Sequence, residues 1–145
     1  MLTMEMLQDA KKVLDGVARK TPVFQSTYIN PDADVYIKCE NMQVTGSFKL
    51  RGAYFKTASL TDAEAQKGVI ACSAGNHAQG VALAAQKKGI PAVICMPESA
   101  PMAKVEATRS YGAEVVLVPG VYDDAAAKAT QLQQEKGYTF LHPSG

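Results

Sequence analysis

The stretch of sequence that decides the fold is GVIACSAGNHAQGVALAAQKKGIPAVICMP, residues 68–97. It contains two short runs, 69–72 and 92–96, that are apolar at nearly every position, which is typical of strands covered on both faces of a sheet. Between them lies a helical stretch near 76–88, followed by Gly89, where a left-handed residue would close the helix. This order predicts a strand, a crossover helix and a second strand parallel to the first.

The same alternation continues toward the C-terminus. Residues 114–118 form a third apolar run, and 138–141 can supply a fourth strand. Helices are predicted near 101–111 and 122–136, each followed by a glycine. The pattern predicts an α/β fold with three layers, αβα, in which helices cover both faces of a parallel sheet. We expect the first three strands to be parallel neighbours.

The part of the chain before residue 68 is less regular. One-sided apolar spacing over residues 3–17 predicts a first helix, with Gly16 near its end. Residues 35–39 are rich in β-branched and aromatic side chains and predict a strand. After a turn that contains glycine, Ser47 can cap a helix that runs through Lys49.

The composition excludes several classes of protein. The 145 residues include 15 basic and 14 acidic side chains, and their formal net charge of +1 comes without a basic block that could bind nucleic acid. No apolar run is long enough to span a membrane, and the N-terminus has no apolar core of a signal peptide. These features predict a soluble cytoplasmic protein with one sizeable core.

The three cysteines give no sign of a metal site. Cys39, Cys72 and Cys95 lie in apolar stretches without CxxC spacing or a clustered histidine. We therefore expect buried, reduced thiols and no metal.

The turn after the first apolar run is a candidate anion site. In doubly wound sheets, ligands bind beyond the carboxyl ends of the strands, where loops lead into helix N-termini. Ser73, Ala74, Gly75, Asn76 and His77 occupy such a turn, and free backbone N–H groups there would hold a carboxylate or phosphate. The alternative is an ordinary turn capped by a serine or asparagine side chain.

Lys49 is the second candidate. An ammonium group in the first turn of a helix faces the positive end of the helix dipole, which favours the neutral amine that imine chemistry needs. Taken by itself, a lysine in a helix is far more often a solvated surface charge.

Two motifs carry a resemblance to a known family. Residues 41–53, NMQVTGSFKLRGA, resemble the lysine motif of the threonine dehydratase and serine racemase group of fold-type II pyridoxal-phosphate enzymes. Residues 71–82, ACSAGNHAQGVA, resemble the asparagine loop of the same group. The likeness continues in the same order at Met96-Pro97, Ala100-Pro101, Lys104 and residues 111–115, so the resemblance covers essentially the whole chain.

The resemblance implies a role for each motif. Lys49 would form the Schiff base with pyridoxal 5'-phosphate and move the α-proton, and Phe48 would lie against the pyridine ring. Asn76 would bond the phenolic oxygen of the ring, and the loop from Ser73 to His77 would receive the substrate carboxylate. The implied enzyme is a lyase of amino-acid metabolism, as in isoleucine biosynthesis, that converts L-threonine or L-serine to a 2-oxo acid and ammonia. A small amino acid as substrate and a homo-oligomeric assembly are also implied.

The resemblance also predicts what this chain lacks. Family members are longer, and their glycine-rich phosphate loop has no counterpart here, so the 145 residues alone are expected to be inactive. Residues 1–52 would belong with a large domain, and residues 53–145 would form the small α/β domain. The alternative for each residue is a structural role: Phe48 would belong to the core, His77 would be a packed histidine, and Arg51 would be a surface charge.

The sequence argues against three other functions and leaves a fourth open. A serine racemase would carry a second serine where this chain has Ala74, and alanine cannot move a proton. A cysteine synthase would have a different lysine motif and a threonine in its asparagine loop. A Rossmann-like nucleotide binder would show GxGxxG after its first strand, which residues 72–77 do not match. A non-catalytic domain that binds a small anion or another subunit is the remaining alternative.

Overall fold

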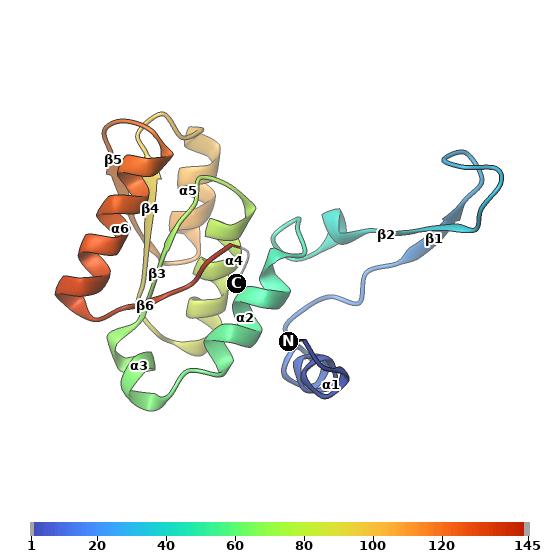
Figure 1. The fold of residues 1–145 in the computed structure, drawn as a ribbon, viewed down its shortest axis with the longest axis horizontal. Helices are drawn as coiled ribbons and strands as arrows, with labels where there is room; N and C mark the ends of the chain where they lie inside the picture. The colour runs from blue at the N-terminus through green and yellow to red at the C-terminus, as the bar shows by residue number, and fades with distance from the viewer. Residues whose placement is uncertain (1, 144–145) are drawn as a thin grey trace.

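The computed structural model describes residues 2–143 and is built on a parallel sheet (Figure 1). The strands are β3 (Val69–Cys72), β4 (Ala92–Pro97), β5 (Glu114–Val118) and β6 (Thr139–Phe140), in the order β5-β4-β3-β6. Every neighbouring pair is parallel, and Cys72 of β3 pairs with Cys95 of β4. The predicted strands and their parallel order are confirmed.

Helices cover both faces of this sheet. Side chains alternate along each strand, so β3 places Val69 and Ala71 in one apolar cluster and Ile70 and Cys72 in another. The first cluster is covered by α4 (Asn76–Lys88) and α5 (Met102–Ser110), and the second by α6 (Tyr122–Lys136). The three-layer αβα architecture expected from the sequence is therefore confirmed.

Two further helices complete this body. The helix α2 (Lys49–Ala58) packs on the outer side of α4 and reaches the first cluster through Ala53. The short α3 (Asp62–Lys67) was not predicted, although its signal is in the sequence. Thr61 and Glu64 form a capping box in which each side chain bonds the backbone N–H of the other.

The N-terminal segment differs most from the expectation. The helix α1 (Met4–Val13) ends with Leu14 as its C-cap, shortly before Gly16, which has a left-handed φ of +72°. The predicted strand over 35–39 is present as β2 (Val35–Lys38). It pairs antiparallel with an unpredicted strand, β1 (Val23–Ser26), in a hairpin that extends away from the body (Figure 1).

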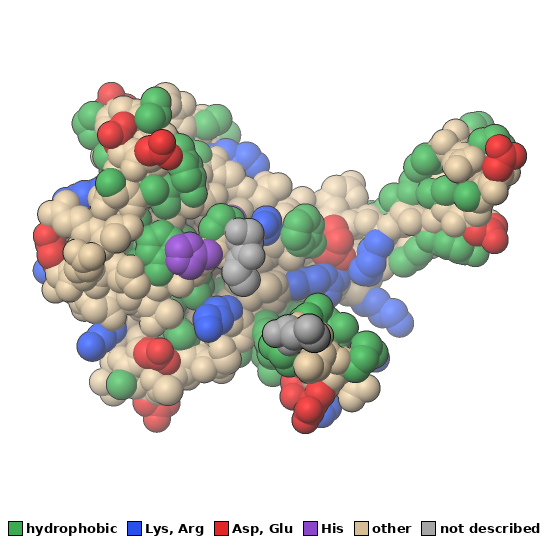
Figure 2. Space-filling view, viewed as in Figure 1, with side chains coloured by type: hydrophobic (Ala, Val, Ile, Leu, Met, Phe, Trp, Pro, Cys, Tyr) green, Lys and Arg blue, Asp and Glu red, His purple; other side chains and the backbone are tan. Residues whose placement is uncertain are grey.

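The N-terminal segment also exposes many large apolar side chains. No residue of α1 is buried, and apolar groups are visible on α1 and on the hairpin (Figure 2). None of the helices among residues 2–143 has the length and apolarity needed to cross a membrane. The exposed apolar residues of this segment are Leu2, Met4, Met6, Leu7, Val13, Val23, Phe24, Tyr28, Ile29, Tyr36 and Ile37.

The cysteines are free thiols, and two of them are buried. Burial raises the pKa of Cys95 to about 11 and also raises the pKa of Cys72, so both are poor nucleophiles. The expectation that all three are buried is wrong for Cys39. It is half-buried because it follows the end of the extended hairpin.

Candidate functional site

Lys49 is the first residue of α2, as the sequence predicts. Phe48, not Ser47 as expected, occupies the N-cap position, but the Oγ of Ser47 still accepts the backbone N–H of Lys49 at 3.1 Å and so meets one donor of the first turn. Gly46 makes the turn before it with φ of +69°. The N–H of Gly46 donates to the carbonyl of Gln43 at 2.8 Å, which closes the loop that leads to the lysine.

The amine of Lys49 points toward the C-terminal end of the chain. Its Nζ donates to the carbonyl oxygen of Pro143 at 2.6 Å and lies 5.2 Å from the centre of the Phe48 ring. The Phe48 side chain is 57% exposed, so its ring is not part of the core in this chain. The amine therefore has an open aromatic face beside it.

The turn before α4 follows β3, at the carboxyl edge of the sheet. The Oγ of Ser73 accepts the N–H of Gly75 at 3.2 Å, and no side chain among residues 2–143 caps α4 at its start. Ala74 is half-buried and Asn76 is exposed. Backbone donors of the first turn thus remain open for an anion.

Asn76 has a partner that the sequence did not reveal. Lys104 of α5 donates from Nζ to the Oδ1 of Asn76 at 3.4 Å, which adds a positive charge to this edge. The two residues are far apart in the sequence and meet only because α4 and α5 lie side by side.

His77 is buried beneath the turn rather than exposed in it. Its Nε2 lies 2.8 Å from the carbonyl oxygen of Leu141. Burial lowers the pKa of His77, so the neutral ring carries its proton on Nε2 and donates to that carbonyl. In this arrangement His77 holds the segment after β6, the segment whose Pro143 contacts Lys49.

Gly80 brings the two candidate segments together. A Cβ added at Gly80 would lie 3.0 Å from the carbonyl carbon of Lys49 and 3.1 Å from the backbone nitrogen of Leu50. The backbone of α2 therefore lies directly on α4, one turn after Asn76. Lys49 and the N-terminus of α4 occupy neighbouring positions because a glycine allows this approach.

Alanine at Gly80 should lower the free energy of unfolding by about 1–3 kcal/mol, because α2 must move away from α4. The matched control is Gly52→Ala, since a Cβ at Gly52 meets nothing within 4 Å. That change should be neutral or stabilise α2 by up to about 1 kcal/mol. Urea unfolding of both variants measures the difference. Equal stability of the two would contradict the close contact.

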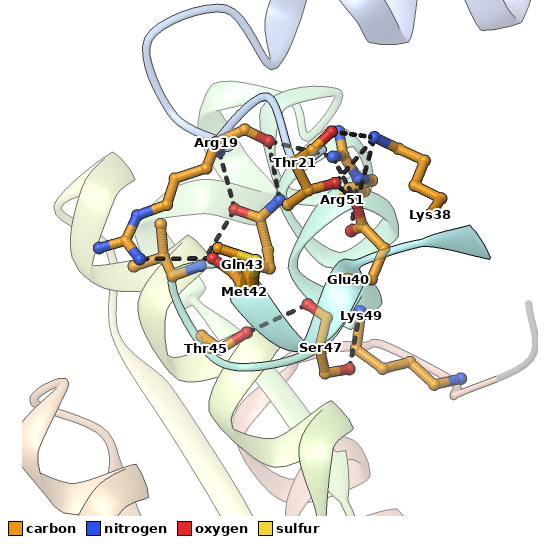
Figure 3. Close-up of polar contacts among 11 residues, drawn as sticks. Arg19, Thr21, Lys38, Glu40, Met42, Gln43, Thr45, Ser47, Lys49 and Arg51 are labelled. Carbon is orange, nitrogen blue, oxygen red and sulfur yellow. Dashed lines mark hydrogen bonds and ion pairs between the residues drawn. The ribbon is translucent and has the colours of Figure 1, made fainter. Parts of the chain in front are cut away.

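A cluster of polar side chains lies around the loop that leads to Lys49 (Figure 3). Glu40 opens the short 3-10 helix η1 (Glu40–Met42), and its carboxylate accepts from Nε and Nη2 of Arg51, both at 2.8 Å. It also accepts the hydroxyl of Thr21 at 2.6 Å, and Lys38 lies 3.7 Å away. Arg51 is thus paired rather than a free surface charge, and no sequence pattern had marked Glu40.

The pH dependence of stability should report this cluster. Hydrogen bonds from Arg51 lower the pKa of Glu40 from 4.5 to about 2. A lowered folded-state pKa contributes stability that is complete above the unfolded value and is lost as the pH falls toward 2. The stability difference between wild type and Glu40→Gln should therefore shrink, by on the order of 2 kcal/mol, between pH 4.5 and 2. Urea titrations at several pH values measure it, and a difference that stays constant would contradict the pairing.

The sequence of the chain matches a known family. The family model described as pyridoxal-phosphate dependent enzyme matches residues 14–145. The L-threonine ammonia-lyase of Thermotoga maritima is 46% identical over 145 residues, which are 99% of this chain and 36% of that protein.

Solved structures give the same result. Maize serine racemase superposes with a TM-score of 0.89 at 35% identity, covering 97% of this chain and 43% of that one. The processed form of threonine deaminase isoform 2 from Solanum lycopersicum superposes with a TM-score of 0.87 at 39% identity, covering 96% and 41%. The chain spans well under half the length of each of these relatives, and it belongs to the family of pyridoxal-phosphate-dependent enzymes.

Proposed function

We propose that the chain is the lysine-bearing part of a lyase that converts L-threonine or L-serine to a 2-oxo acid and ammonia by α,β-elimination. The observation that supports this most is the contact between the Lys49 backbone and Gly80, because it sets the start of α2, which carries Lys49, against the first turns of α4. An amine that can bond an aldehyde and a site for a carboxylate are the two features that an amino-acid substrate and this cofactor require.

The residues of this chain fit part of the cofactor. Lys49 offers a primary amine next to the exposed ring of Phe48, against which a flat heterocycle can stack. Asn76 is exposed and offers an amide for a phenolic oxygen. The chain has no glycine-rich loop for the phosphate, and we propose that this group is held by the part of the longer relatives that the chain does not span.

When bound, pyridoxal phosphate would draw electrons from the α-carbon of the substrate. The amine of Lys49 would take the α-proton and would have to leave the carbonyl of Pro143 to do so. The free N–H groups of the Ser73–His77 turn would orient the substrate carboxylate. Ala74 has no group that can move a proton on the opposite face, which favours elimination over racemisation.

The longer relatives suggest what completes the site. We propose that residues 1–52 pack against the part of those proteins that this chain does not span, as a large domain beside the small domain of residues 53–145. A groove of about 610 Å³ between α1 and α2 supports this, since Leu7, Leu14 and Phe55 line it and α1 has no buried residue. A homo-oligomer is a further part of the proposal.

Absorbance of the purified chain with pyridoxal phosphate tests the lysine's role. Titration should produce a saturable absorbance band of a covalent lysine adduct. Pyridoxal, which lacks the phosphate, should give a similar band because the chain has no glycine-rich loop to bind that phosphate. A non-catalytic anion-binding domain would give only the weak, non-saturable reaction of its exposed lysines, and the band would be the same in Lys49→Ala. That outcome would overturn the proposed function.

A further inference from the structure

Glu40 connects the elements that surround the loop leading to Lys49. Its carboxylate accepts two bonds from Arg51 on α2 and one from Thr21, which precedes β1. Lys38, the last residue of β2, donates to Thr21 at 2.8 Å as well as lying near Glu40. One side chain thus joins the base of the hairpin to the first turn of α2.

Gln43 fixes the other end of the same loop. It is 2% exposed, and its side chain bonds both backbone groups of Arg19: Oε1 accepts the N–H at 2.8 Å, and Nε2 donates to the carbonyl at 3.0 Å. Arg51 also donates to the carbonyl of Arg19, at 3.1 Å. The loop from Gln43 to Lys49 is therefore held at both ends by polar contacts.

None of these contacts involves the amine of Lys49, whose side chain points away from the cluster (Figure 3). Residues two apart on a helix point in nearly opposite directions, so Arg51 faces Glu40 while Lys49 faces the segment at Pro143. A bidentate pair fixes orientation as well as contributing energy. Glu40 can therefore act on Lys49 only by setting the rotation of the first turn of α2.

We propose that Glu40 is a positioning residue for Lys49, acting through Arg51 to hold the first turn of α2 in the rotation that directs the amine toward the segment at Pro143. The inference rests on the function proposed above for Lys49. It assigns to the Glu40–Arg51 pair a role in presenting the amine that is separate from its contribution to stability.

The test is competitive acetylation of every lysine by trace acetic anhydride, read by mass spectrometry across pH 7–10. In the wild type, the bond to Pro143 should keep Lys49 less reactive than Lys56, which is exposed on the same helix. In Glu40→Gln, the reactivity of Lys49 relative to Lys56 should rise about ten-fold, or ~1.4 kcal/mol. Arg51→Gln should give the same change, and the double variant no more than either single one.

Two controls separate positioning from folding. Glu64→Gln removes a carboxylate that accepts from the backbone N–H and the hydroxyl of Thr61 in the capping box of α3, and it should leave the reactivity of Lys49 relative to Lys87 unchanged. Lys87 and Lys136 serve as reference lysines because both are exposed in helices, and far-UV circular dichroism reports global unfolding. If Glu40→Gln unfolds the chain, Arg51→Lys provides a second variant. It keeps the positive charge but loses the bidentate hydrogen bond, and it should still change the reactivity of Lys49 selectively. Wild-type reactivity of Lys49 in folded variants, with only a lower melting temperature, would overturn the proposal.

Pyridoxal phosphate distinguishes this inference from the proposed function. If the wild type forms no adduct at Lys49, the proposed function fails, while acetylation still decides whether Glu40 positions the amine. If wild type and Glu40→Gln form the adduct at the same rate, the positioning role is overturned although the function stands.

Discussion

The 145-residue chain, supplied with excess pyridoxal phosphate, should release 2-oxobutanoate from L-threonine far more slowly than about 1 per second, the lower end of typical enzyme turnover. The phosphate is the most highly charged group of the cofactor. Each charge-assisted hydrogen bond to it contributes about 1.5–3 kcal/mol to the binding free energy. Losing two such bonds would weaken cofactor binding by about two orders of magnitude or more. The apolar surface left open on α1 and the hairpin should add to the defect by favouring self-association.

A chimera provides the matched comparison. Residues 1–145 can be continued with the part of the Thermotoga maritima ammonia-lyase that follows the matched region, since the match covers 36% of that protein. The chimera should turn over L-threonine at about 1 per second or faster. Turnover at that rate by the 145 residues alone would show that the missing parts are dispensable or that another chain supplies them.

Replacing Lys49 by alanine in that chimera should lower turnover by at least about 10²–10⁴-fold, because the amine is the only group assigned to move the α-proton. The same change should abolish the covalent absorbance band. Lys56→Ala is the control, since Lys56 is exposed on the same helix as Lys49 and should be neutral. Equal turnover of the two variants would contradict the role proposed for Lys49.

The centre of the sheet was predictable because β3 and β4 are buried on both faces. Val69, Ile94 and their neighbours are apolar at every position, and the glycines after α4 and α6 take the left-handed conformation that the closing position requires. These are local signals, and the right-handed crossover rule converts them into a parallel order.

The N-terminal segment was harder because its side chains have few contacts within the chain. The apolar spacing of α1 correctly predicts a helix but gives no position for it, as none of its residues is buried. The strand at 23–26 has an exposed, weakly patterned sequence, and only its pairing with β2 defines it. Tertiary contacts decide such elements, and a single sequence does not report them.

The candidate site was predicted in part. The positions of Lys49 and of the turn at Ser73–His77 follow from helix starts. The Glu40–Arg51 pair and the bond from Lys104 to Asn76 join residues from different elements, so no spacing in the sequence marks them. His77 was expected in the candidate anion site of the Ser73–His77 turn. Its position as a buried donor to the carbonyl of Leu141 depends on where β6 ends.

The most direct test is to reduce the complex of the chain and pyridoxal phosphate with borohydride and to map the labelled peptide. We predict a single label on Lys49, beside Phe48 and across from Gly80. A label on Lys56 or Lys104, with none on Lys49, would contradict the account.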